Sequence, residues 1–232
     1  MTTIMSFITG TPSHAPTITP LGYGILVSLL LACFFLTHTH YASSRYQRFW
    51  RRVQYLQIIG LYGWYLLMHF DLAECLPLFH CRIAALAVLF LPSGKLKTYF
   101  AYLGIAGANC ALLCPVFDPY PFPHLTILSY VIGHLALLTN SLIYLYLSRD
   151  QEVSQLTFPF VLKVTLLTNM VIGAADVLLR ANYGFLRETI LIGSKNGLFN
   201  LLVVTTVLSI MVFAVQNVVM RHPEQGLLAR RS

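Results

Sequence analysis

The stretch LFNLLVVTTVLSIMVFAVQNVVM, residues 198–220, contains no charged side chain and is long enough to cross a lipid bilayer as an α-helix. The rest of the chain has the same character, since 57% of its residues are hydrophobic, 10% are charged, and its mean hydropathy is +0.70. Soluble domains carry about 25% charged residues, so this chain lacks the polar side chains for a solvated surface. Its apolar content also excludes an intrinsically disordered protein. The 232 residues therefore predict a single all-α polytopic membrane helix bundle.

Seven segments have the length and apolar composition expected of membrane-spanning helices. They lie near residues 21–36, 53–70, 76–91, 96–115, 124–147, 156–179 and 198–220. The third segment is the weakest candidate, because it is short, places Pro77 in its first turn and contains the polar run His80-Cys81-Arg82. A proline is tolerated in a first turn, so we expect a full span there. A re-entrant hairpin formed by the third and fourth segments is the alternative.

The distribution of basic residues predicts the orientation of the bundle. With the N-terminus outside, the cytoplasmic segments carry Arg45, Arg48, Arg51, Arg52, Lys95, Lys97, Arg149, Arg221, Arg230 and Arg231, whereas the external segments carry Arg180, Arg187 and Lys195. Basic residues accumulate in cytoplasmic loops, so we expect the C-terminus inside. Residues 1–20 then form an extracytoplasmic segment, residues 21–220 the transmembrane bundle and residues 221–232 a basic cytoplasmic tail. The net charge of +7 thus reflects topology, and we expect no nucleic-acid partner.

Most polar residues of the predicted spans fall in the outer half of the bundle. Ionisable groups are costly inside a bilayer and are therefore candidates for function. A cluster on one side of the membrane indicates a site open to the outer leaflet, because an ion path would place polar groups across the full thickness. The cluster comprises His69, Asp71, Glu74, His80, Cys81, Arg82, His134, Asp176, Asn182 and Tyr183.

This cluster holds the components of nucleophilic catalysis. A thiol such as that of Cys81 becomes a nucleophile when an imidazole accepts its proton, and a nearby cation such as Arg82 favours the thiolate. His134 is the more plausible base, because the adjacent His80 does not face Cys81 on a helix. Candidates to orient the imidazole are Asp176 and Asn140, and candidates to bind a developing oxyanion are His80, Asn182 and Tyr183.

Structural roles are the alternative for each of these residues. Cys81 can be a small buried hydrophobe, and His134 can form a hydrogen bond between helices. Arg82 can form an ion pair with Asp176 or Glu74. A disulfide could join Cys75 to Cys81 or Cys114, while Cys33 and Cys110 are expected to be packing residues.

No cofactor or metal is predicted from the sequence. The five cysteines lack the paired CxxC spacing of zinc sites. Convergence of His69, Asp71 and His80 on a metal ion is a minor alternative, because a His-x-Asp pair at the end of a helix is weak evidence.

The segment LPLFHCR, residues 76–82, resembles an element of the YwaF-like family of bacterial integral membrane proteins. Tyr99-Phe100, the small residues 104–108 and His134 follow in the same order, and NYGFL, residues 182–186, is similar to the NYxFL element of that family. The resemblance covers roughly residues 20–220. It departs from the family at Phe79, where the motif has a histidine, and after NYGFL, where the chain reads RET at residues 187–189.

The YwaF-like family is related to a eukaryotic transmembrane acyltransferase that remodels ether phospholipids, and more distantly to androgen-induced-type lipid hydrolases. The resemblance implies a multi-pass protein of a bacterial plasma membrane, with Cys81 and His134 at the positions of a catalytic Cys-His pair. We therefore expect a lipid acyltransferase or acyl hydrolase that forms an acyl-thioester, with membrane lipids as substrate or environment. A transporter or ligand-binding protein with a polar outer cavity and a non-enzymatic envelope scaffold are the alternatives. The sequence does not identify a protein partner.

Overall fold

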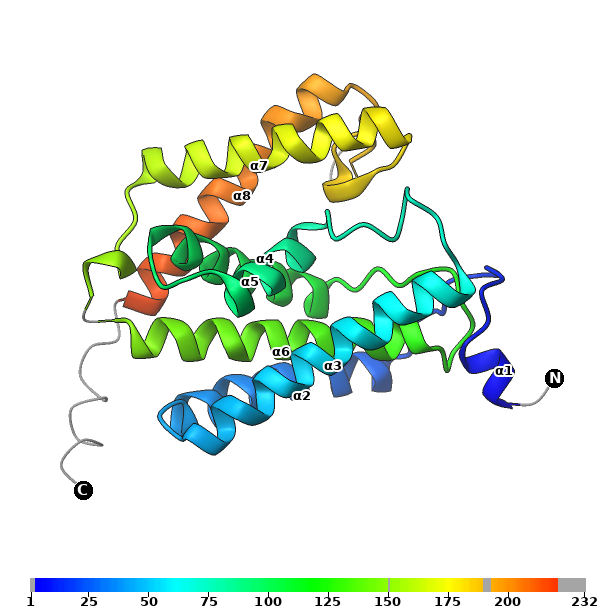
Figure 1. Ribbon diagram of the computed structural model, residues 1–232, viewed down its shortest axis with the longest axis horizontal. Coiled ribbons are helices and arrows are strands. Elements are labelled where there is room, and N and C mark those ends of the chain that lie inside the picture. Colours follow the sequence, from blue (N-terminus) through cyan, green and yellow to red (C-terminus); the bar gives the residue numbers. More distant parts are fainter. Residues whose placement is uncertain (1–2, 150, 190–192, 221–232) are drawn as a thin grey trace.

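The computed structural model describes residues 3–149, 151–189 and 193–220 (Figure 1). Within these residues the chain is entirely helical and forms no strand, which confirms the predicted all-α class. The predicted tail, residues 221–232, lies outside the described residues. The helices are α1 Thr3–Phe7, α2 Pro20–His40, α3 Ser44–Met68, α4 His80–Phe90, α5 Lys95–Leu113, α6 Leu125–Leu147, the 3-10 helix η1 Glu152–Ser154, α7 Phe158–Leu179, the 3-10 helix η2 Tyr183–Phe185 and α8 Gly197–Met220.

Each of the seven predicted segments contains all or part of one helix from α2 to α8, and these helices run alternately between two ends of the bundle (Figure 1). Among the described helices, α2, α6, α7 and α8 are long and apolar enough to cross a membrane. The other three helices, α3, α4 and α5, do not combine the length and the apolar composition of a membrane-spanning helix. Helix α3 begins with a run of arginines and α5 is less apolar. Helix α4 has 11 residues and is roughly 16 Å long, about half the thickness of a bilayer core.

The expected start of the third segment is wrong. Helix α4 begins at His80, and Pro77 lies in the preceding loop instead of the first turn. The residue before a proline is disfavoured in helical conformation, which keeps Leu76 out of a helix. The backbone N–H of Leu76 instead donates a hydrogen bond to the Tyr183 hydroxyl at 3.0 Å.

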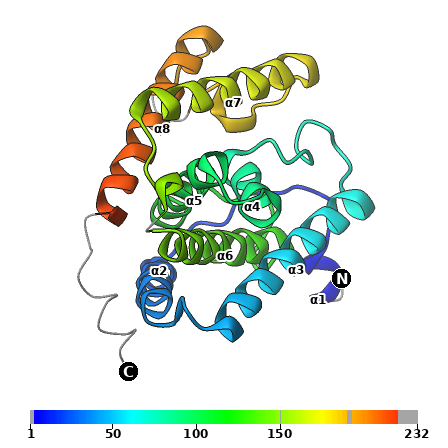
Figure 2. The same ribbon diagram turned by 60° about the vertical axis from the view of Figure 1, so that its left-hand side comes forward.

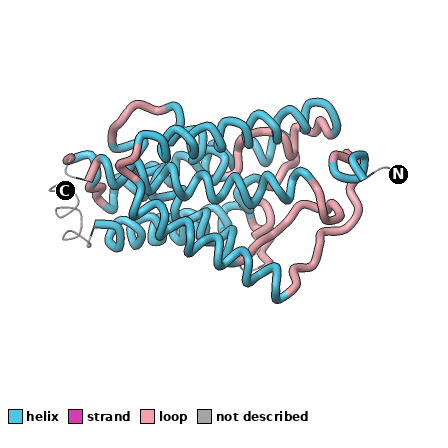
Figure 3. Tube along the Cα trace, turned by 90° about the horizontal axis from the view of Figure 1, so that it is seen from below, coloured by secondary structure: helices cyan, strands magenta, loops and turns pink. Residues whose placement is uncertain are grey.

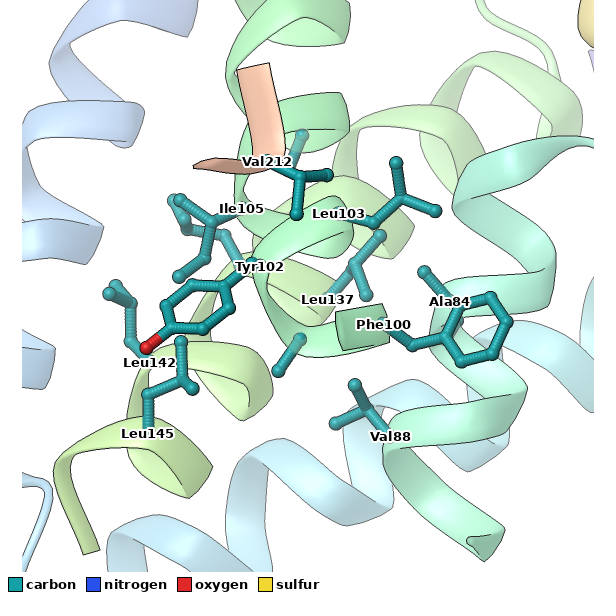
Figure 4. Packing of buried hydrophobic residues seen from close by; sticks show 14 of the residues in the cluster. Ala84, Val88, Phe100, Tyr102, Leu103, Ile105, Leu137, Leu142, Leu145 and Val212 are labelled. Atoms are coloured by element: carbon teal, nitrogen blue, oxygen red, sulfur yellow. The ribbon is translucent and has the colours of Figure 1, made fainter. Parts of the chain in front are cut away.

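Helix α5 lies at the centre of the bundle. Helices α4 and α5 form a middle layer between the α7–α8 pair and α6, and α2 and α3 cover the other side of α6 (Figures 1 and 2). Tyr102, Leu103 and Ile105 of α5 pack against Leu137 and Leu142 of α6 in the core (Figure 4).

Close approach of α5 and α6 depends on a glycine. A Cβ atom at Gly104 would lie 2.7 Å from Ser141 Oγ and 2.8 Å from Leu137 Cδ1. The absence of a side chain at Gly104 therefore sets the spacing of the two central helices.

Candidate functional site

The connections at one end of the bundle surround most of the predicted site residues. Residues 69–79, residues 114–124 and the described parts of residues 180–196 lie at the end where α1 is found (Figures 1 and 3). The opposite end has the short α2–α3 and α4–α5 links and the α6–α7 connection with η1. We call the first of these the loop end and the second the basic end, after Arg45, Arg48, Arg51, Arg52, Lys95, Lys97 and Arg149.

Cys81 occupies the first turn of α4 and faces α5. Its Sγ lies 2.7 Å from the position of a Cβ atom at Gly107, so the glycine makes room for the thiol. The residue is half-buried against the central core. A thiol in this position is held by packing on α5 and lies within two turns of the loop end of that helix.

All five cysteines are free, so neither alternative disulfide forms. Cys33 is buried, as expected of a packing residue, and its Sγ lies 2.8 Å from Thr139 Oγ1. The same expectation is wrong for Cys110, whose side chain is exposed on α5.

His134 lies on α6 with one ring nitrogen fixed by the helix backbone. Its Nδ1 lies 2.7 Å from the Tyr130 carbonyl oxygen, which can only accept a hydrogen bond, so Nδ1 carries the proton. Its ring packs against the Tyr130 ring at a centroid distance of 4.4 Å. The Tyr130 hydroxyl donates to the Ala111 carbonyl at 2.9 Å and so ties this part of α6 to α5. The remaining lone pair of His134, on Nε2, is thereby available to accept a proton.

Arg82 makes polar contacts with neutral oxygens. Its guanidinium donates to the Glu74 backbone carbonyl at 3.0 Å and to the Tyr65 hydroxyl at 2.8 Å, and it lies 4.8 Å from the centroid of the Phe79 ring. In the described part of the chain it forms no ion pair with the carboxylate of Asp176 or Glu74. Its positive charge remains uncompensated by a direct carboxylate contact and acts electrostatically on both Cys81 and His134.

His80 points away from α5 and toward the α7–α8 pair. Its Nε2 lies 2.6 Å from Asn169 Oδ1, and Asn169 Nδ2 donates to Thr205 Oγ1 at 2.9 Å. The ring also packs on Gly184, which has a φ of 63° and where a Cβ atom would lie 2.6 Å from His80 Cε1. Sequence reasoning missed Asn169 and Thr205. The only signal for them is a polar residue at a buried position of an apolar helix.

Asp176, Asn182 and Tyr183 organise the connection between α7 and α8. Asp176 Oδ1 accepts a 2.6 Å hydrogen bond from the Tyr183 backbone N–H. The Tyr183 hydroxyl donates to the Leu72 carbonyl at 2.7 Å, and burial raises the pKa of Tyr183 to about 12, which keeps this donor protonated. Asn182 Oδ1 accepts from the backbone N–H groups of Arg187 and Glu188, both at 3.0 Å.

Two candidate orienting residues therefore have other partners. Asn140 Nδ2 donates to the Trp50 carbonyl of α3 at 3.2 Å, and Asp176 is engaged with Tyr183. Within the described residues, neither makes a hydrogen bond to His134. The Tyr130 carbonyl oxygen accepts the hydrogen bond from His134 Nδ1 and so orients the imidazole ring.

A cavity of about 710 Å³ opens between α7 and α8 at the loop end. Its walls are mainly apolar, from residues such as Met170, Val177, Leu198 and Leu201, with polar groups from Asn169, Asp176, Arg180 and Arg187. Such a lining suits an acyl chain better than a small polar solute.

The described residues contain no group of three His, Cys, Asp or Glu side chains that could hold a metal ion. His69, one member of the alternative metal set, instead pairs with Glu74, with 3.2 Å between Nε2 and Oε2.

Comparison with known proteins gives a family assignment. No curated protein and no solved structure matches the chain. A model of the TMEM164 family matches residues 9–219, which include every described helix from α2 to α7 and all but the last residue of α8. The match agrees with the membrane-protein character expected from the sequence, and the YwaF-like relationship stays a prediction. Because the match covers most of its length, the chain belongs to the TMEM164 family, a family of membrane proteins.

Proposed function

We propose that this protein is a membrane lipid acyltransferase or acyl hydrolase in which Cys81 is the nucleophile and His134 is the general base. The observation that carries the proposal is the hydrogen bond from His134 Nδ1 to the Tyr130 carbonyl. It leaves Nε2 unprotonated in the neutral imidazole, which is the form that a base requires. In other nucleophilic sites a carboxylate or amide holds the tautomer in this way.

Two neighbours of Cys81 are compatible with this role. Gly107 of α5 has no side chain opposite Cys81 Sγ, so no side chain at that position covers the sulfur. Burial of the thiol opposes its ionisation, and the positive charge of Arg82 offsets part of this cost. Because the guanidinium is held by the Glu74 carbonyl and the Tyr65 hydroxyl, no carboxylate neutralises that charge by direct contact.

The reaction proceeds in two steps. His134 Nε2 accepts the Cys81 proton, the sulfur attacks the ester carbonyl of a lipid, the carbon–oxygen bond breaks, and the imidazolium returns the proton to the leaving alcohol. The acyl group is then a thioester on Cys81. A hydroxyl of a lyso-lipid attacks this thioester in acyl transfer, or water attacks it in hydrolysis, while His134 takes the proton of the attacking hydroxyl and passes it to the departing sulfur.

The proposal includes a topology. Helices α2 to α8 are the seven membrane segments of a multi-pass plasma-membrane protein, with the loop end outside and the basic end in the cytoplasm. The short α4 reaches only part of the way across the bilayer, and the preceding residues 69–79 complete the passage to the outer surface. In this proposed topology, Cys81 and His134 lie in the half of the bundle that is nearer the outer surface.

The cavity between α7 and α8 is mainly apolar, which suits an amphiphilic ligand better than a polar solute, and neither Cys81 nor His134 lines it. No observation in the described part of the chain favours a scaffold role.

The proposal is tested by lipid turnover in the purified protein, reconstituted with a phospholipid that carries a labelled acyl chain and with an unlabelled lyso-phospholipid. We expect Cys81→Ala and His134→Ala each to lower formation of labelled products at least about 100-fold, because each removes a catalytic group. Cys110→Ala is the matched control, since Cys110 is an exposed thiol near the same end. Unchanged turnover in Cys81→Ala contradicts the proposal.

A further inference from the structure

A second cavity, of about 250 Å³, lies at the basic end, far along α6 from His134. It is enclosed by α3, the α4–α5 link and the last turns of α6. Its polar lining includes two cationic side chains, Arg51 and Lys97, and two side-chain amides, Gln47 and Asn140.

Two cations of this cavity come from different helices and have no acidic partner among the described lining residues. Arg51 on α3, which is exposed, and Lys97 on α5, which is half-buried, both line the cavity, so it concentrates positive charge. Lys97 is held in place, because its Nζ donates to the Leu91 carbonyl at 2.9 Å and lies 5.1 Å from the centroid of the Tyr144 ring. An anion between Arg51 and Lys97 balances this charge and provides acceptors for the free N–H groups.

Neutral donors complete the polar side of the cavity. Gln47 and Asn140 each use an amide N–H for a backbone carbonyl, that of Tyr41 at 2.8 Å and that of Trp50 at 3.2 Å. An amide group has a second N–H, which remains for a ligand. A tetrahedral phosphate has enough oxygens to accept from cations and amides together, whereas a halide does not offer separate acceptor positions.

The lining also includes apolar side chains such as Leu89 and Leu147, of which Leu147 is 52% exposed at the bundle surface. The volume is below the roughly 300–1,000 Å³ of sites that enclose a whole small molecule. The phosphate of a lipid headgroup fits the small volume, and the apolar part of the same lipid can stay outside the cavity against its apolar residues. The neighbouring exposed arginines, Arg48 and Arg52, attract the same anionic lipid surface.

We propose that this cavity is a binding site for the phosphate of an anionic phospholipid headgroup, with Arg51 and Lys97 as its charged ligands. The site is separate from the proposed chemistry at Cys81 and does not depend on it. It anchors the basic end in an anionic leaflet through a specific headgroup, beyond the diffuse attraction that surface arginines provide.

The test is native mass spectrometry of the full chain in detergent, titrated with phosphatidylglycerol or phosphatidylcholine. We expect the Kd for phosphatidylglycerol to rise at least about tenfold in the double variant Arg51→Gln, Lys97→Gln, because charge-assisted hydrogen bonds are lost. The matched control, Arg48→Gln with Lys95→Gln, removes the same charge at exposed positions outside the cavity and changes the Kd by less than about twofold. Arg51→Lys keeps a cation at the site and is expected to retain binding, while an unchanged circular dichroism spectrum of the double variant excludes misfolding as the cause of its loss.

Two results overturn the proposal. An equal loss of binding in the control variant shows that phosphatidylglycerol responds only to overall surface charge. Displacement of phosphatidylglycerol by an equal concentration of glycerol 3-phosphate or inorganic phosphate assigns the cavity to a soluble phosphate instead of a lipid. We expect neither soluble compound to compete, because neither contacts the apolar residues of the lining.

Discussion

Helices α5 and α8 show opposite relations between hydropathy and burial. Helix α8 is strongly apolar, yet only 28% of its most apolar 18-residue window is buried, and its buried positions include Asn200, Thr205, Ser209 and Gln216. Helix α5 is less apolar but is buried at every position from Thr98 to Ala106. In a lipid environment apolar side chains gain little by leaving the surface, so small and polar residues fill the helix interfaces. Burial, and not hydropathy, identifies the helix on which this bundle is built.

Alanine substitutions at one buried and one exposed leucine test whether burial determines the contribution of a side chain to stability. Leu138 on α6 has no exposed surface, whereas Leu178 on α7 is 81% exposed. We expect Leu138→Ala to lower the free energy of unfolding by about 3 kcal/mol through lost packing contacts, and Leu178→Ala to change it by less than about 0.5 kcal/mol. Unfolding of the purified protein in mixed micelles by a denaturing detergent measures both. A similar loss of unfolding free energy in the two variants would show that the Leu178 side chain is buried in the folded protein.

Alanine substitutions at two glycines are expected to change the stability of the protein in opposite directions. Alanine at Gly104 of α5 meets Ser141 and Leu137, so we expect Gly104→Ala to cost about 2 kcal/mol of stability. A Cβ atom at Gly60 of α3 has no atom within 4 Å, so Gly60→Ala is expected to stabilise the protein by about 0.5 kcal/mol through its higher helix propensity. The same unfolding measurement applies. A stabilised Gly104→Ala variant contradicts the close approach of α5 and α6.

Several polar contacts attach the α7–α8 pair to the rest of the bundle, and one of them runs from His80 of α4 through Asn169 of α7 to Thr205 of α8. Asn169→Ala leaves the His80 ring nitrogen and the Thr205 hydroxyl without their partner, at a cost of about 1–2 kcal/mol. We expect faster amide hydrogen exchange in α7 and α8 with little change in α5. Asn217→Ala, at an exposed asparagine of α8, is the control and leaves exchange unchanged. Uniform acceleration across all helices would contradict a local bridge.

The smallest effect concerns the docking of the N-terminal segment at the loop end. His124 Nε2 lies 3.1 Å from the Thr9 carbonyl, and Nδ1 accepts from the Thr126 N–H at 3.2 Å, so the ring is bound in its neutral form. Burial lowers the pKa of His124 below its ordinary value of 6.5. The docking free energy is thus fully present above pH 6.5 and is lost as the pH falls toward the lowered pKa.

Limited proteolysis of residues 5–19 as a function of pH measures this release. We expect cleavage to increase below pH 6.5, with a free-energy change under about 1 kcal/mol near pH 6. His124→Asn keeps a side chain that can cap α6 and removes the titrating group, so its cleavage is independent of pH in this range. An unaltered pH profile in that variant would assign the release to another group.

The sequence predicts the helices of this fold well, because each apolar segment is bounded by charged or proline-containing turns. Six of the seven segments correspond closely to helices, with α3 extended into the arginine run by more than two turns. The third segment differs because its first residues are extended and contact Tyr183, which is distant in the chain. A contact between residues that are distant in the chain leaves no periodic pattern in the sequence.

The candidate site is less predictable, because depth in the membrane does not determine which way a side chain faces. His80 and Cys81 are neighbours in sequence, but His80 meets Asn169 of α7 and Cys81 meets Gly107 of α5. Asn140 is close to His134 in sequence, yet it faces α3. The orienting group that the sequence does not reveal is the backbone carbonyl of Tyr130, since every helical residue has one.

The central claim is tested most directly by trapping the acyl-enzyme. Intact mass spectrometry of the purified protein is carried out after brief exposure to an activated lipid ester, with and without hydroxylamine, for the wild type, Cys81→Ala, His134→Ala and Cys110→Ala. The account predicts one hydroxylamine-sensitive acyl group on the wild type and on Cys110→Ala, none on Cys81→Ala, and much slower acylation of His134→Ala. An equal acyl adduct on Cys81→Ala, or an unmodified wild type that still turns over lipid, would contradict it.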